Sequence, residues 1–78
     1  MHKFESILVD EKLIRDLRLS QEQVDLMTPK MKKSAVKVYF QQGGGDFIKS
    51  YYSDLMGCLM MEFKHIVIGV EKDGYAHS

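Results

Sequence analysis

A run of three glycines, Gly43 to Gly45, is the first place where this sequence could hold a ligand. Backbone amides in a glycine-rich turn between a strand and a helix can bind phosphate, and the helix N-terminus adds positive potential. The pattern here matches no phosphate-binding fingerprint, because no Lys-Ser or Lys-Thr pair follows and the spacing is not G-x-G-x-x-G. Asp46, directly after the run, would repel an anion. We therefore expect a flexible turn at residues 42–46 and no phosphate site.

A second candidate for binding is a cluster of lysines in the middle of the chain. The cluster consists of Lys30, Lys32, Lys33 and Lys37. No acidic residue lies between positions 30 and 40, although the whole chain balances 11 basic residues against 11 acidic ones. Lysines grouped in this way can neutralise nucleic-acid phosphates, contact an acidic protein, or form a solvated face.

The order of the elements around these lysines loosely resembles a helix-turn-helix motif. Two short helical segments precede Thr28-Pro29, and the lysine-rich segment follows them. The resemblance implies nucleic-acid binding by residues 28–40, provided that residues 30–42 are helical. The segment holds no arginine, which is the commonest side chain for reading bases. Nucleic-acid binding is therefore the alternative hypothesis for the function.

Residues suited to catalysis or metal binding are few and scattered. The chain has one cysteine, Cys58, and 3 histidines, of which His2 and His77 lie near the ends. On a strand, the side chains of Cys58 and His65 would point to opposite faces, which argues against a cysteine–histidine nucleophile pair. The acidic residues suit helix caps and exposed helix faces. The sequence therefore predicts no enzyme activity, no metal site and no cofactor.

The most apolar part of the chain runs from Leu55 to Val70, where only Glu62, Lys64 and His65 can carry charge. A domain of this size buries only about 60% of its unfolded surface, so a self-sufficient core is marginal. A single cysteine cannot form an internal disulfide, which leaves association as the remaining means of stabilisation. The segment must therefore be the core, an interface with another chain, or both. We expect a homodimer, contact with another protein, or both, and a well-packed monomer is the alternative.

The predicted contact surface combines apolar residues of this segment with the two tyrosines before it: Tyr51, Tyr52, Met60, Met61, Phe63, Ile66 and Ile68. Met60 and Met61 are adjacent, so on a strand one of them points away from a layer of helices on the other face. Methionine and aromatic residues are enriched in interface cores. The outward methionine is therefore the best single candidate for a contact.

Local signals predict mostly helices in the first half of the chain. Residues 3–9 alternate like a short strand, and Asp10 is a candidate N-cap for a helix over residues 10–19. Residues 20–23 match a capping box that opens a second helix. Pro29 suits the first turn of a further helical segment over residues 29–34. The β-branched and aromatic residues of 35–41 then predict a strand.

The second half gives one ambiguous segment and one clear one. Asp46 as a cap and Gly57 as the residue that ends a helix predict a helix over residues 46–57. The alternative is a strand over residues 47–53, with the glycines closing a hairpin, which Tyr51-Tyr52 favours. Residues 58–70 predict one long strand that ends at the turn 72–74.

Together these elements predict a single compact α+β domain over residues 1–78, with two to four strands and two or three helices packed on one face. The net charge of zero gives no general attraction to nucleic acid or to anionic membranes. The apolar run is too short to span a bilayer, and the first residues lack the apolar core of a signal peptide. We therefore expect a cytoplasmic, non-enzymatic interaction module, either a regulatory or inhibitor protein or an assembly subunit, that acts as a homodimer.

Overall fold

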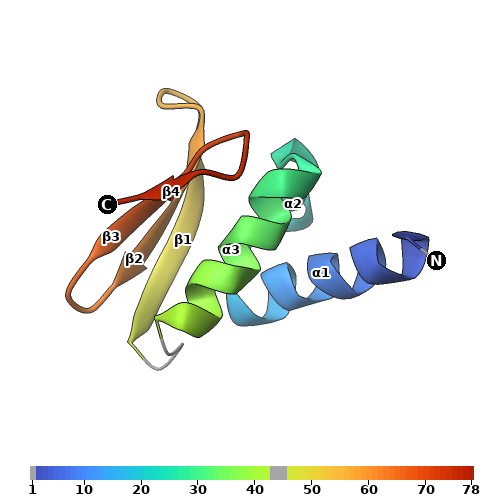
Figure 1. Ribbon diagram of the computed structural model, residues 1–78, viewed down its shortest axis with the longest axis horizontal. Helices are drawn as coiled ribbons and strands as arrows, with labels where there is room; N and C mark the ends of the chain where they lie inside the picture. Colours follow the sequence, from blue (N-terminus) through green and yellow to red (C-terminus); the bar gives the residue numbers. More distant parts are fainter. Residues whose placement is uncertain (1, 43–45) are drawn as a thin grey trace.

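The computed structural model describes residues 2–42 and 46–78, which form a layer of helices followed by a sheet (Figure 1). The elements in order are α1 (His2–Asp16), α2 (Gln21–Leu26), α3 (Pro29–Gln41), β1 (Phe47–Ser53), β2 (Cys58–Phe63), β3 (Val67–Val70) and β4 (Ala76–His77). The four strands form an antiparallel sheet in the order β1-β2-β3-β4. The expected α+β class is confirmed. The expected turn at 42–46 lies partly outside the described residues.

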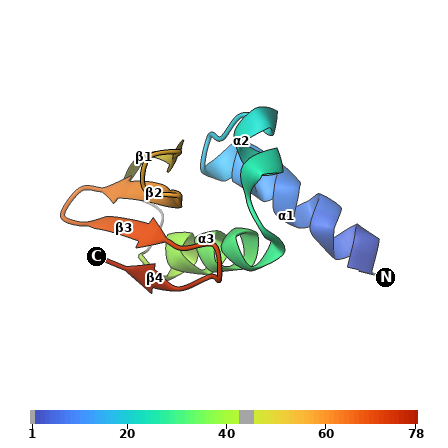
Figure 2. The same ribbon diagram turned by 90° about the horizontal axis from the view of Figure 1, so that it is seen from above.

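The three helices lie to one side of the sheet, and no described element covers its other face (Figure 2). The core fills the space between helices and sheet, because alternate strand residues face the helices. Its largest fully buried side chains are Leu13, Leu17, Met31, Leu59, Met61, Val24, Val70 and Cys58. All but Cys58 belong to one apolar cluster shared by helices and strands.

The first helix is longer than the sequence predicted, and the strand expected over residues 3–9 is wrong. Those residues belong to α1, so Asp10 lies inside the helix rather than at its N-cap. Val9, Leu13 and Leu17 recur at a spacing of four, which places them on the helix side that packs on the core. The Asp10 carboxylate pairs with the Lys32 ammonium group at 2.9 Å, which links α1 to α3.

The signals for the next two helix starts are confirmed. The Ser20 hydroxyl accepts from the Gln23 N–H at 3.2 Å, and the Gln23 side chain accepts from the Ser20 N–H, which completes the capping box. At α3, the Thr28 hydroxyl accepts from the Met31 N–H at 3.1 Å and donates to the Lys72 carbonyl at 2.6 Å. Thr28 therefore starts α3 and also ties it to the turn between β3 and β4.

The strand expected over residues 35–41 is wrong, because α3 continues through them. Met31, Ala35 and Val38 are buried at the i, i+4, i+7 spacing of a helix, whereas Phe40 is exposed. Residues 35–41 also alternate like a strand, since Val36, Val38 and Phe40 are two apart. Packing of the helical stripe on the core outweighs the weak local preference for a strand.

The helix expected over residues 46–57 is also wrong, and the alternative strand is confirmed as β1. Gly57 lies in the turn that joins β1 to β2, so it does not end a helix. The long strand expected over residues 58–70 is two strands, because the chain turns at residues 64–66 and the Phe63 N–H donates to the Ile66 carbonyl at 2.8 Å.

The turn expected at residues 72–74 is confirmed and requires glycine at its end. Gly74 has a φ of +89°, a backbone conformation that other residues rarely adopt. A Cβ placed there would lie 3.1 Å from the Lys30 carbonyl oxygen. The β3–β4 turn therefore packs directly against the first turn of α3.

None of the helices in residues 2–42 and 46–78 is long and apolar enough to span a bilayer.

Candidate functional site

The structure divides the predicted contact residues between the core and the surface. Met61, Phe63 and Ile68 are only 0%, 5% and 7% exposed, because they pack beneath the helices. These three therefore hold the helical layer and are not available to a partner in this fold. Tyr52 packs partly against the same core, while Tyr51 and Ile66 are exposed. The apolar segment is thus partly the core of the chain and partly surface, since Leu55 and Met56 are also exposed, and the expected contact with a partner stays a prediction.

One row of side chains crosses the uncovered side of the sheet. Tyr51 on β1 is the direct partner of Met60 on β2, Met60 is the partner of Gly69 on β3, and Gly69 is the partner of His77 on β4. We name this surface the open face; it consists of Lys49, Tyr51, Met60, Glu62, Val67, Gly69 and His77. Because Gly69 has no side chain, the His77 ring lies directly above it, 3.3 Å from the position of a Cβ.

Charged groups frame this row and are paired with each other. Lys49 and Glu62 are cross-strand neighbours whose charged atoms lie 3.7 Å apart, and the Lys49 ammonium group also lies 5.7 Å from the centre of the Tyr51 ring. At the other end, His77 Nε2 and a Glu71 carboxylate oxygen are 2.6 Å apart, and Tyr75 stacks on the His77 ring. An apolar centre with a polar rim is the usual anatomy of a protein interface.

Cys58 is buried at the edge of the open face, where its surroundings favour the protonated thiol. Its thiol donates to Met60 Sδ at 3.5 Å. Burial raises the pKa of the Cys58 thiol, and the nearby Glu71 carboxylate raises it further. A thiol with a raised pKa stays protonated at neutral pH, whereas the thiolate is the reactive species. Among the side chains of residues 8–42 and 46–78, no three His, Cys, Asp or Glu groups are placed to hold a metal ion.

The buried thiol gives an expected pH dependence of stability. In the unfolded chain a thiol ionises near pH 8.5, whereas folded Cys58 keeps its proton to higher pH. The unfolded state therefore loses a proton first, and the fold is progressively destabilised as pH rises above about 8.5. The Cys58→Ala variant has no thiol at this position, so it does not lose stability in this way at high pH. Urea unfolding should show that the stability advantage of the native chain over Cys58→Ala is smaller at about pH 10 than at about pH 7. An advantage that is equal at both pH values would contradict the burial of the thiol.

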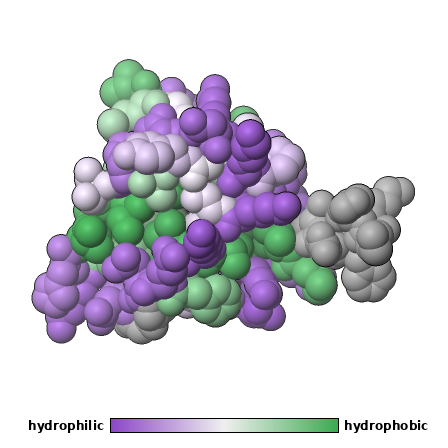
Figure 3. Space-filling view, viewed as in Figure 1, coloured by the Kyte–Doolittle hydropathy of each residue, from purple (hydrophilic) through white to green (hydrophobic). Residues whose placement is uncertain are grey.

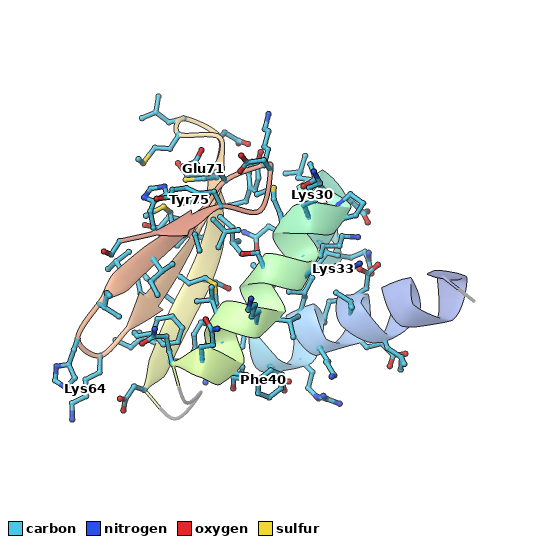
Figure 4. The ribbon with its side chains drawn as sticks, in the orientation of Figure 1. Lys30, Lys33, Phe40, Lys64, Glu71 and Tyr75 are labelled. Carbon is cyan, nitrogen blue, oxygen red and sulfur yellow. The ribbon has the colours of Figure 1, made fainter. Side chains whose placement is uncertain are left out.

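The lysine cluster lies on α3, and three of its four members face solvent. Lys30, Lys33 and Lys37 are exposed, whereas Lys32 is paired with Asp10. Figure 4 shows Lys30 and Lys33 on α3, well away from Lys64 at the turn between β2 and β3. Residues 30–41 of the segment that the helix-turn-helix resemblance requires to be helical belong to α3, and Gln42 is the C-cap. A resemblance in element order alone does not establish a function.

Reasoning from the sequence missed five residues of the open face: Lys49, Glu62, Val67, Gly69 and His77. It also missed Glu71, which contacts His77. The sequence reading ended the sheet at residue 70, so it placed nothing opposite β3. The Lys72-Asp73-Gly74 turn was the available signal, because a tight turn after a strand commonly leads into a paired strand.

Comparison with known proteins adds no relative to this picture. No family model matches the chain, and neither the curated proteins nor the solved structures gave a significant match.

Proposed function

We propose that the chain is a small non-enzymatic interaction module that acts by surface binding as a homodimer, in the manner of a regulatory protein or an assembly subunit. The observation that supports this proposal is the pairing of Tyr51 with Met60 on the sheet face that no helix covers. Two such faces can pack against each other as in a β-sandwich, where sheets stack about 10 Å apart. Lys49 and Glu62 give the face one charge of each sign, which suits contact with a copy of itself.

The dimensions of the face predict weak association. The strands have 7, 6, 4 and 2 residues, and at about 3.4 Å per residue and about 4.8 Å between strands they cover about 300 Å² on each copy. Two copies would together bury about 600 Å², which is below the roughly 1,200 Å² of standard interfaces. Apolar burial at about 25 cal/mol per Å² then gives only a modest driving force. We expect a dimer that dissociates on dilution rather than an obligate one.

Sedimentation velocity over a hundredfold range of protein concentration tests the proposal. The native chain should shift from monomer to dimer as concentration rises. Met60→Asp should stay monomeric throughout, because it buries an unpaired charge at the contact. Leu26→Asp is the matched control: Leu26 is exposed on α2, so this variant should dimerise like the native chain. A native chain that remains monomeric at the highest concentration would overturn the dimer.

A second candidate is nucleic-acid binding by α3, which the exposed row of Lys30, Lys33 and Lys37 on a true helix favours. Three phosphate contacts predict that log K for duplex DNA falls with log salt at a slope of about −2.7. The triple alanine variant of these lysines should lose the binding, and Lys49→Ala should keep it. An absence of binding at about 50 mM salt would exclude this candidate.

A further inference from the structure

A hollow lies between the end of α3 and the edge of the sheet, and it shares only His77 with the open face. Its volume is about 240 Å³. Its lining is apolar at Val38, Ile66, Ile68 and Ala76, and polar at Gln41, Gln42, His77 and Ser78. Figure 3 shows this apolar region beside the hydrophilic band of α3. Small-molecule sites usually measure about 300–1,000 Å³, so the hollow suits one or two side chains of a partner better than a metabolite.

Among the described residues, no strand pairs with the outer edge of β4, whereas the segment before α2 contacts β1 on the opposite side of the sheet. At β1, Arg18 Nη1 donates to the Ile48 carbonyl at 3.3 Å, and the Ser50 hydroxyl donates to the Leu17 carbonyl at 2.8 Å. At β4, the Tyr75 carbonyl accepts from the Glu71 N–H at 2.8 Å, so the backbone carbonyl of Tyr75 is directed toward the end of β3. Alternation along an antiparallel strand then directs the N–H and C=O of Ala76 outward. An outward row of this kind can pair with an added strand.

The wall opposite this edge is formed by one stripe of α3. Lys30, Ser34, Lys37 and Gln41 follow each other at spacings of four, three and four, so they share one side of the helix. Lys30 contacts the β3–β4 turn, and Gln41 lines the hollow. Lys37, between them, therefore also borders the groove.

The α3 wall of this groove is positive, because its stripe carries two lysines and no acid. The carboxylates on β4's side are held by β4 itself, since Glu71 contacts His77 and the Asp73 side chain accepts from the Tyr75 N–H at 3.0 Å. An occupant of this groove is favoured if it brings carboxylates to the lysine stripe.

We propose that the groove binds an extended acidic segment of a partner protein, which adds as a fifth strand at the β4 edge. One apolar side chain of the segment fills the hollow, and a carboxylate two residues along it meets Lys37. The spacing fits, because four helix residues rise about 6 Å and two strand residues about 6.6 Å. Main-chain hydrogen bonds supply affinity and alternate side chains supply selectivity in this mode of recognition. This surface shares only His77 with the open face and does not depend on a homodimer.

The test uses fluorescein-labelled peptides and fluorescence anisotropy. The probe is the acetylated peptide TLTETET, which carries one leucine and two glutamates on the same side of a strand. Its control is TLTKTKT. We expect TLTETET to bind at least tenfold more tightly than the control, and Lys37→Glu to weaken it at least tenfold. Lys12→Glu changes the net charge by the same amount, but Lys12 lies on α1 over the Phe40 ring. The affinity of this variant for TLTETET should therefore stay within twofold of the native value.

Amide NMR spectra locate the peptide and separate this proposal from the homodimer. The Ala76 N–H should shift on peptide addition, and Met60→Asp should bind the peptide like the native chain. Equal binding of both peptides, equal losses from Lys37→Glu and Lys12→Glu, or an Ala76 signal unmoved by peptide would each overturn the proposal. An Ala76 signal that moves with protein concentration alone would also overturn it, because a second copy would then occupy the edge.

Discussion

Replacing Met61 with aspartate is expected to unfold the protein, whereas the same change at the adjacent Met60 is expected to leave it folded. Met61 is completely buried beneath the helices, and Met60 lies on the open face. A buried, unpaired carboxylate costs several kcal/mol, and losing the methionine side chain costs a further 2–5 kcal/mol, approximately. A domain of this length has about 4–12 kcal/mol of stability in total. The Met60 variant should lose about 1 kcal/mol or less.

Far-ultraviolet circular dichroism and urea unfolding measure this pair of variants. The Met61 variant should lack a cooperative transition, and the Met60 variant should retain one near the native midpoint. Equal destabilisation of both would mean that neither face of β2 is open, which contradicts the arrangement of the layers.

The second large effect is expected at α3, where Ala35→Asp should destabilise the fold strongly and Lys37→Asp only slightly. Ala35 is fully buried on the helix side that packs on the core, and Lys37 faces solvent. Aspartate lowers helix propensity at both positions, and the loss from alanine exceeds the loss from lysine by only about 0.3 kcal/mol. The difference between the variants therefore reports burial, and we expect it to exceed about 3 kcal/mol.

This pair also separates a helix from a strand. On a strand, residues 35 and 37 would share one face, so the two variants would be affected alike. Urea midpoints that differ little between the variants would therefore contradict the helical assignment of residues 35–41.

The helix starts were predictable because each depends on a few adjacent residues. The capping box at Ser20 and the proline after Thr28 are local chemistry, and both form as expected. The turn ending at Gly74 is local in the same sense. The α+β class followed from the presence of both helical and strand-like segments.

The errors occurred where two periodicities coexist in one segment. Residues 35–41 alternate like a strand, yet Met31, Ala35 and Val38 also form a helical stripe, and only packing decides between them. The turn at residues 64–66 carries no glycine or proline, so nothing local marked the break in the predicted strand 58–70.

The sequence predicted the candidate site only in part, because it left open which face of the strand with Met60 and Met61 is exposed. Alternation showed that Met60 and Met61 point to opposite sides, but the sequence does not say which side the helices cover. Met60 lies opposite Tyr51 because of the register between β1 and β2. Local signals in residues 46–57 favour a helix, so the sequence predicted no such strand pairing. The groove at the β4 edge depends on contacts between α3 and a strand more than thirty residues away.

Methionine oxidation by hydrogen peroxide, read residue by residue by mass spectrometry, tests the central claim most directly. In dilute solution, Met56 at the exposed turn should react fastest and Met60 more slowly, while Met31 and Met61 stay protected. At a hundredfold higher concentration, Met60 should become at least fivefold slower and Met56 should be unchanged. A Met61 that reacts as fast as Met60 would contradict the fold, and a Met60 rate independent of concentration would contradict association through the open face.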